Sequence, residues 1–140
     1  MRNNIETTAG RIPRTVIVAE KDPISRTALA AMLSYDGYRV LQADSVSSVI
    51  SQMNSIGHIG VLLADLDMVG WRSLIRHVVQ TTDALVIGLE GNVRFSKMYD
   101  LKQHGIRACL QKPFIYEDVR TAIMGNSESV HDEALHRKAA

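Results

Sequence analysis

Acidic and lysine side chains stand at the ends of short apolar runs in this sequence, where they could form one charged site. They are Glu20, Lys21, Asp65, Glu90 and Lys112. Carboxylate oxygens are the ligands that hard cations such as Mg²⁺ take in proteins, and lysine ammonium groups pair with carboxylates and phosphates. No glycine-rich loop follows the first apolar run, which disfavours nucleotide binding. The pattern therefore indicates a site whose chemistry depends on charge.

Five short runs, the first of them apolar and β-branched, predict the strands that would carry these side chains. The runs cover residues 15–19, 39–43, 59–64, 84–89 and 108–110. The segments between and after them are amphipathic and predict helices over 23–36, 45–56, 72–80, 92–104 and 115–124. This alternation predicts an α/β fold, a three-layer doubly wound sheet of five parallel strands. We expect the flavodoxin-like strand order 2-1-3-4-5.

The first predicted helix has clear signals at both ends. Asp22 suits the N-cap position, Pro23 suits the first helical position, and Gly37 suits the stop. Its apolar residues predict an inward stripe, formed by Ile24, Ala28, Leu29, Met32 and Leu33.

The predicted topology brings several charged residues together. In an open doubly wound sheet, ligands bind beyond the carboxyl ends of the strands. The first and third strands are neighbours in the expected order, so Glu20, Lys21 and Asp65 should converge. Asp67 follows two residues after Asp65, and we expect its side chain to be solvated.

Length and composition limit the remaining possibilities. The 140 residues fit one domain, and the net charge of +1 gives no strong attraction to nucleic acid or to an anionic membrane. The apolar runs are too short to span a bilayer, and the polar start does not resemble a signal peptide. Cys109 is the only cysteine, which excludes an internal disulfide. We expect its side chain to be buried, as free cysteines usually are. We expect a cytoplasmic protein with a disordered segment 1–13, a domain over 14–124 and a polar tail or linker over 125–140.

Three segments together resemble the receiver domains of two-component response regulators. VIVAEKDP (16–23) is similar to their first strand and acidic cluster, and VLLADLDM (61–68) is similar to the strand that ends in the phosphoacceptor aspartate. QKPF (111–114) is similar to the Lys-Pro element that closes the site. The resemblance extends over roughly the whole predicted domain.

The resemblance implies a role for each matching residue. Asp65 takes the position of the aspartate that accepts a phosphoryl group, and Lys112 that of the lysine that pairs with it. Glu20 takes the first position of the acidic pair. If Mg²⁺ binds, the resemblance implies Glu20, Asp65 and Asp67 as the residues that would hold it.

Four features depart from the family pattern. Lys21 stands where the family has a second acid that ligates magnesium, and Glu90 stands where it has a serine or threonine that binds the phosphoryl oxygen. Cys109 takes the position of the switch aromatic. The loop after Asp65 is shortened and lacks the usual Pro-Gly.

These departures predict an atypical receiver with impaired phosphorylation. A lysine at a ligand position removes an oxygen from the Mg²⁺ shell and adds a repelling charge. We expect Lys21 to pair with Asp65 or Glu90, so that two lysines nearly balance the three acids Glu20, Asp65 and Glu90 without a metal. No cofactor is then expected, and the chain would not be an enzyme beyond self-phosphorylation. The alternative is a functional phosphoacceptor that uses Mg²⁺ and is phosphorylated on Asp65 by a histidine kinase.

The partner expected from the resemblance is a histidine kinase or another signalling protein, and a homodimer is also compatible with it. No recognition helix or membrane segment is evident, so neither nucleic acid nor membrane is expected to bind this domain. The family commonly meets its partners on the face made by the fourth helix, fifth strand and fifth helix. The residues expected there are Arg94, Lys97, Tyr99, Lys102, Arg107, Tyr116 and Arg120.

Overall fold

A computed structural model describes residues 15–91 and 98–125 of the chain. Its strands are β1 (Thr15–Ala19), β2 (Arg39–Ala43), β3 (Val61–Asp65), β4 (Leu85–Glu90) and β5 (Ala108–Gln111). Its helices are α1 (Pro23–Tyr35), α2 (Val46–Ile56), α3 (Trp71–Thr81), α4 (Met98–Gln103) and α5 (Tyr116–Ile123). The strands form one parallel sheet in the order β2-β1-β3-β4-β5, which confirms the predicted fold.

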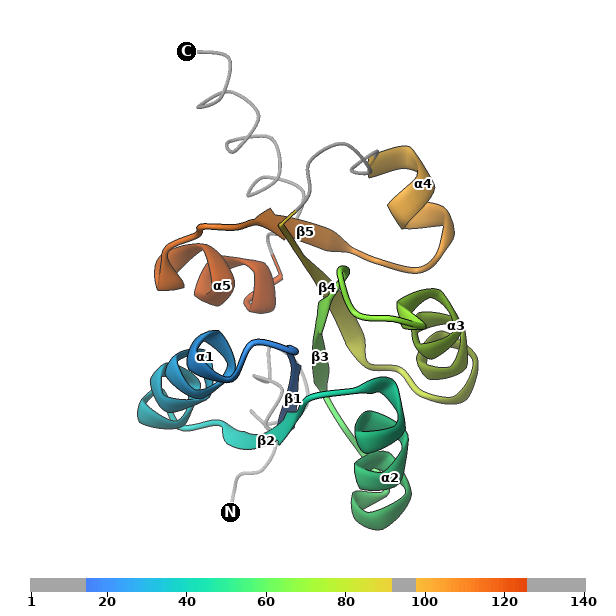
Figure 1. The fold of residues 1–140 in the computed structure, drawn as a ribbon, viewed down its shortest axis with the longest axis horizontal. Helices are drawn as coiled ribbons and strands as arrows, with labels where there is room; N and C mark the ends of the chain where they lie inside the picture. The colour runs from blue at the N-terminus through green and yellow to red at the C-terminus, as the bar shows by residue number, and fades with distance from the viewer. Residues whose placement is uncertain (1–14, 92–97, 126–140) are drawn as a thin grey trace, which may run out of the picture.

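The helices cover both faces of the sheet, as Figure 1 shows. Helices α1 and α5 lie on one face, and α2, α3 and α4 lie on the other. Alternate residues of each strand enter two separate cores, because successive side chains of a strand point to opposite faces. Val18 and Leu63 belong to the α1/α5 core, whereas Ile17 and Leu62 belong to the α2/α3/α4 core.

The predicted helix signals agree with the structure where it describes them. Asp22 caps α1, since its carboxylate accepts a hydrogen bond of 2.9 Å from the Ser25 amide. Ser45 caps α2 in the same way, through a hydrogen bond of 3.2 Å from the Ser48 amide. Asn92, the predicted start of the fourth helix, lies outside the described residues.

The predicted stripe of α1 is partly wrong. Leu29 and Leu33 are buried as expected, but Ile24 is 79% exposed, Met32 is 43% exposed, and Ala28 is also exposed. The inner face is completed by Ala30, which the pattern did not single out. Because α1 carries apolar residues on several sides, its composition does not specify which side faces the sheet.

Most of the two predicted terminal segments is not described by the structure. The predicted segment 1–13 and the predicted tail, apart from Gly125, lie outside the described residues. In the part that is described, no helix combines the length and the apolar character needed to cross a membrane.

Candidate functional site

The carboxyl ends of three strands bring together two acids and a lysine. Glu20 follows β1, Asp65 ends β3 and Lys112 follows β5. Each stands two residues after a strand residue of the α1/α5 core, namely Val18, Leu63 and Leu110. Their side chains therefore leave the sheet on the same side. Glu20 is 2% exposed and Asp65 is fully buried, so these carboxylates require polar partners.

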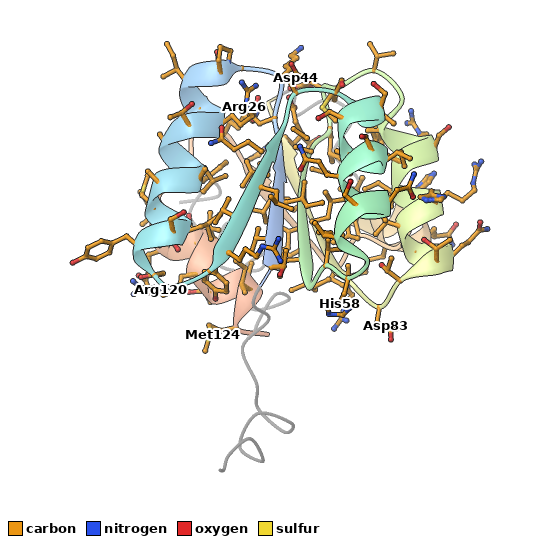
Figure 2. All side chains as sticks on the ribbon, turned by 90° about the horizontal axis from the view of Figure 1, so that it is seen from below. Arg26, Asp44, His58, Asp83, Arg120 and Met124 are labelled. Atoms are coloured by element: carbon orange, nitrogen blue, oxygen red, sulfur yellow. The ribbon has the colours of Figure 1, made fainter. Side chains whose placement is uncertain are left out.

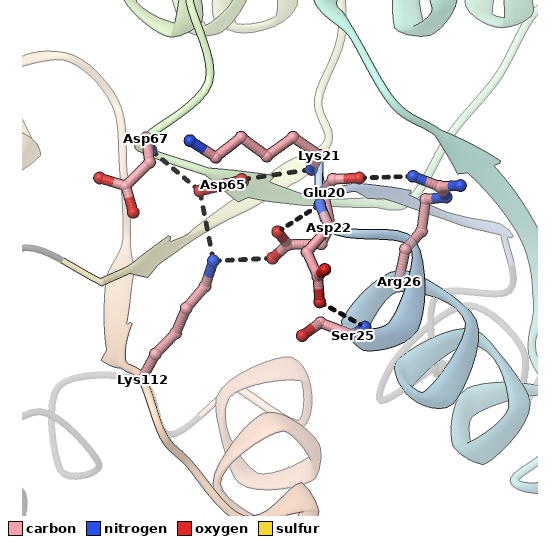
Figure 3. A network of polar contacts seen from close by, with 8 residues as sticks. All are labelled: Glu20, Lys21, Asp22, Ser25, Arg26, Asp65, Asp67 and Lys112. Atoms are coloured by element: carbon pink, nitrogen blue, oxygen red, sulfur yellow. Dashed lines mark hydrogen bonds and ion pairs between the residues drawn. The ribbon is translucent and has the colours of Figure 1, made fainter.

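Lys112 is the cation that joins the two acids. Its Nζ atom lies 2.8 Å from Glu20 Oε1 and 3.4 Å from Asp65 Oδ1, as Figure 3 shows. The predicted pairing of Lys112 with Asp65 is therefore present in the structure. We call Glu20, Asp65 and Lys112 the acid–lysine cluster.

Backbone amides complete the coordination of the Asp65 carboxylate. Oδ1 accepts a hydrogen bond of 2.9 Å from the Asp67 amide, and Oδ2 accepts one of 3.3 Å from the Lys21 amide. Both oxygens are thus occupied by donors from the loops after β3 and β1 (Figure 3). The sequence indicated the side chains of Asp67 and Lys21, whereas it is their main-chain groups that contact Asp65.

The two acids differ in their affinity for protons. Burial raises the pKa of Glu20, because it outweighs the hydrogen bond from Lys112. Burial also acts to raise the pKa of Asp65, but hydrogen bonds, led by the one from the Asp67 amide, outweigh it and lower the pKa. Burial acts to lower the pKa of Lys112, yet the hydrogen bond to Glu20 and the charge of Asp65 raise it overall. Glu20 is therefore the first member of the cluster to take up a proton as the pH falls.

Lys21 does not form the predicted ion pair. Its side chain is exposed, and within residues 15–91 and 98–125 its ammonium has no carboxylate in ion-pair range. The reason is geometric, because Lys21 alternates with Glu20 along the chain and so leaves the strand end in a different direction. Asp67 is exposed, as predicted.

Glu90 and Cys109 form a separate pair on the other face of the sheet. The Cys109 thiol donates a hydrogen bond of 3.2 Å to Glu90 Oε1, and both residues are buried. Glu90 follows Gly88 by two residues, and Gly88 is the partner of Cys109 in the β4–β5 register. The same alternation that gathers the acid–lysine cluster therefore directs Glu90 to the α2/α3/α4 side.

This separation corrects the predicted charge balance. The contacts join two carboxylates to one ammonium, instead of three carboxylates to two ammonium groups. Lys21 and Glu90 also stand at strand ends, but their side chains are not part of the acid–lysine cluster.

A cavity of about 390 Å³ lies beside Glu90, next to the loop that follows Asp65. It is lined by Leu66, Asp67, Met68, Val69, Gly70, Trp71, Arg72, Glu90 and Leu101. The Arg72 guanidinium lies 4.5 Å from the centre of the Trp71 ring. We therefore expect the fluorescence of Trp71 to respond to changes in the loop that follows Asp65.

Several solved structures of response regulators have the same fold. A response regulator from Burkholderia pseudomallei, solved with a phosphorylated aspartic acid, a calcium ion and citrate, aligns with a TM-score of 0.76 and 22% identity, covering 86% of this chain and 72% of that one. A receiver domain protein from Clostridium thermocellum aligns with a TM-score of 0.73 and 21% identity, over 83% and 95% of the two chains. A CheY-like receiver domain protein from Methanospirillum hungatei JF-1 aligns with a TM-score of 0.65 and 25% identity, over 84% and 97%.

The chain has the fold of a response-regulator receiver domain. No family model and no curated protein matches its sequence. The acid–lysine cluster lies at the edge of the receiver sheet where the first, third and fifth strands end. Glu20, Asp65 and Lys112 are the residues that the sequence resemblance indicated for that edge.

The receiver fold raises the question of whether these residues suit Mg²⁺, which prefers an octahedral shell of oxygen ligands. Throughout the described part of the chain, no group of three or more His, Cys, Asp or Glu side chains is arranged to hold a metal ion. The two carboxylates that do meet are already bridged by the Lys112 ammonium. This edge of the sheet therefore offers two carboxylates, both in contact with an ammonium, and no third acidic side chain grouped with them among the described residues.

Two residues of the predicted partner face lie elsewhere. Tyr116 Oη donates a hydrogen bond of 2.8 Å to Asp36 Oδ2, and Arg120 pairs with the same carboxylate at 3.3 Å. Figure 2 shows Arg120 beside the end of α1 that is remote from Arg26. These two side chains therefore join α5 to α1. Lys102 and Arg107 are exposed, Arg94 and Lys97 lie outside the described residues, and the Tyr99 side chain is not described.

Proposed function

We propose that this chain is a two-component receiver domain that acts as a protein-interaction module, with phosphorylation at Asp65 impaired. The observation that carries the proposal is the composition of the acid–lysine cluster. Two carboxylates share one ammonium, and the position from which a receiver would supply its further acidic ligand holds Lys21. A phosphoryl group is dianionic near neutral pH, so its arrival at Asp65 would need additional positive charge.

The Glu90–Cys109 pair supports a further part of the proposal, that the state of Asp65 is not transmitted to the face that binds partners. A serine or threonine at position 90 would donate a hydroxyl hydrogen to a phosphoryl oxygen, whereas an ionised carboxylate has none to donate. Glu90 instead accepts the Cys109 thiol within the core. A small buried side chain at position 109 also cannot move between buried and exposed positions as a large aromatic can. Binding to a partner should then be independent of phosphorylation.

The partner expected is a histidine kinase or another signalling protein rather than nucleic acid. Lys102 and Arg107 remain exposed on the side of α4 and β5, where receivers commonly bind proteins. The net charge of +1 gives no broad field that would attract nucleic acid.

A functional phosphoacceptor is the second candidate, and one observation favours it. Asp65 remains buried at the end of β3 with Lys112 Nζ at 3.4 Å, the pair expected from receivers that do accept phosphate. Under this alternative Mg²⁺ would bind despite the incomplete donor set. Measurements of Mg²⁺ binding and phosphate uptake separate the two candidates.

We expect millimolar Mg²⁺ to change neither the fluorescence of Trp71 nor the melting temperature. Trp71 is the only tryptophan and lines the cavity next to the Asp65 loop, so metal binding there would alter its surroundings. The physical reason is the lack of oxygen ligands described above. A saturable response in the natural sequence that is absent from Asp65→Asn would contradict the prediction. Sodium chloride at matched ionic strength tests whether any response reflects ionic strength alone.

A further inference from the structure

The outward face of α1 is apolar and lacks any cover among the described residues. Ile24 is 79% exposed and Tyr35 is 92% exposed, and Ala28 and Ala31 between them are also exposed. These four residues lie on the opposite side of the helix from those that pack on the sheet, which are Leu29, Ala30 and Leu33. We call Ile24, Ala28, Ala31 and Tyr35 the α1 stripe. A helix that is apolar on two opposite sides is typical of one buried between two layers.

The spacing of the α1 stripe is that of a helix–helix seam. Its members are separated by four, three and four residues, which is the alternation of the a and d positions in a heptad. The positions that flank this seam hold Ser25, Thr27, Met32 and Ser34, none of which is charged. Charges at such flanking positions normally select one partner over another. Their absence means that two copies of the same helix can meet without repulsion.

The order of residues also suits a two-fold axis. The separations read the same from either end of the stripe, with a large residue at each end and an alanine at each inner position. In an antiparallel pair Ile24 of one copy meets Tyr35 of the other, and Ala28 meets Ala31. The small central residues allow the two backbones to approach closely. We propose that two copies of this chain associate through their α1 helices in this antiparallel, two-fold arrangement.

A groove beside the stripe supplies a complementary feature. It has a volume of about 260 Å³ and is lined by Ala31, Met32, Tyr35, Asp36, Tyr116 and Arg120. Antiparallel pairing places Ile24 of the second copy at the mouth of this groove, because Ile24 then lies opposite Tyr35. The projecting side chain therefore meets a recess in both halves of the pair.

In the antiparallel arrangement the exposed Asp22 of one copy approaches the end of α1 in the other copy, where Arg120 lies with its carboxylate partners Asp36 and Glu117. That end holds one cation and two acids, so charge does not favour the pairing, and the apolar seam and the groove must stabilise it. This association does not depend on the proposed signalling function or on Asp65.

Sedimentation velocity on the full chain tests the association. We expect a concentration-dependent dimer for the natural sequence, and a monomer for Ile24→Glu and for Ala28→Glu, since each variant buries two like charges at the seam. Val69→Glu is the matched control, because Val69 is 93% exposed on the loop before α3, away from α1. Circular dichroism should be the same for all four proteins. If the natural sequence is a monomer even at high concentration, the proposal is wrong, and another protein could then cover the stripe. A dimer that survives both α1 substitutions would also overturn the proposal.

Disulfide trapping tests the antiparallel direction. With a rise of about 1.5 Å per residue, the two copies of position 28 lie only about 5 Å apart along the axis, and the two copies of position 35 about 16 Å apart. A disulfide needs Cα atoms within about 7 Å. Ala28→Cys should therefore cross-link on mild oxidation, whereas Tyr35→Cys and the natural sequence, whose Cys109 is buried, should not. Equal cross-linking of both variants would indicate a parallel pair and contradict the arrangement.

Discussion

Lys112→Met is expected to destabilise the fold by about 3 kcal/mol near neutral pH, the largest effect of any surface-accessible substitution at this site. The substitution keeps most of the apolar stem and removes the ammonium that lies within 2.8 Å of Glu20 and 3.4 Å of Asp65. Two buried carboxylates would then face each other without a cation. Removal of one partner of a buried ion pair is strongly destabilising, because the charge left behind is neither solvated nor neutralised. Urea unfolding followed by circular dichroism measures the change.

The loss should become smaller as the pH falls. The pKa of Glu20 is already raised by burial, and removal of Lys112 raises it further. A group whose pKa is higher in the folded than in the unfolded protein favours folding when protonated and opposes it as the pH rises through the folded value. The difference between Lys112→Met and the natural sequence should therefore begin to narrow above the usual pKa range of glutamate, as the pH falls through the raised pKa of Glu20 in the variant.

Lys21→Met is the matched control for this experiment. Lys21 is adjacent to the same acids in the chain, but its exposed ammonium makes no ion pair with any described carboxylate. We expect a change within about 0.5 kcal/mol. Equal effects of the two substitutions would mean that general charge, and not the contacts of Lys112, stabilises the acids.

Lys21→Asp combined with Glu90→Thr is expected to increase phosphorylation from acetyl phosphate by about a hundredfold or more. Lys21→Asp returns an acid to the loop whose backbone amide contacts Asp65, and Glu90→Thr replaces an acid at the end of β4 by a hydroxyl that can donate to a phosphoryl oxygen. A hundredfold change in rate corresponds to about 2.7 kcal/mol in the activation free energy. One unfavourable charge contact near 4 Å is worth about 4 kcal/mol at an effective dielectric of 20, so a change of this size remains after part of that energy is lost to desolvation. Mobility on a phosphate-retarding gel, with Mg²⁺ present, gives the phosphorylated fraction.

The same double variant with Asp65→Asn is the control, and it should show no retarded band. Each single variant separates the two contributions, and we expect Lys21→Asp to have the larger effect because the Asp65 carboxylate lies next to the Lys21 backbone. If the double variant stays unphosphorylated, the shortened loop after Asp65 would be the cause of impairment instead of the two substitutions.

The fold and the acid–lysine cluster could be predicted from sequence because both follow from simple periodicities. Apolar runs of strand length alternate with amphipathic segments, and this alternation specifies the order of layers. Glu20, Asp65 and Lys112 come directly at strand ends, so the meeting of parallel strands at one edge brings them together.

The environment of Lys21 and Glu90 could not be predicted in the same way. Whether a residue at a strand end faces one layer or the other depends on the register of the sheet, which the sequence alone leaves open. The Glu90–Cys109 pair follows from that register, since Gly88 is aligned with Cys109.

Contacts between distant segments were also missed. Asp36 stands at the end of α1 and binds Tyr116 and Arg120, which follow it by 80 and 84 positions in the sequence. Such a pairing depends on how α1 and α5 lie on the sheet. The exposed α1 stripe has the same origin, because α1 is apolar enough to pack on either side.

Intact mass measurement of the natural sequence after incubation with acetyl phosphate and Mg²⁺ tests the central claim most directly. The claim is that Asp65 does not accept a phosphoryl group efficiently under conditions in which receivers usually do. We predict an unchanged mass in the natural sequence, alongside a phosphorylated fraction in the Lys21→Asp/Glu90→Thr variant treated in parallel. A mass increase of one phosphoryl group in the natural sequence, absent from Asp65→Asn, would contradict the account and identify the chain as a functional phosphoacceptor.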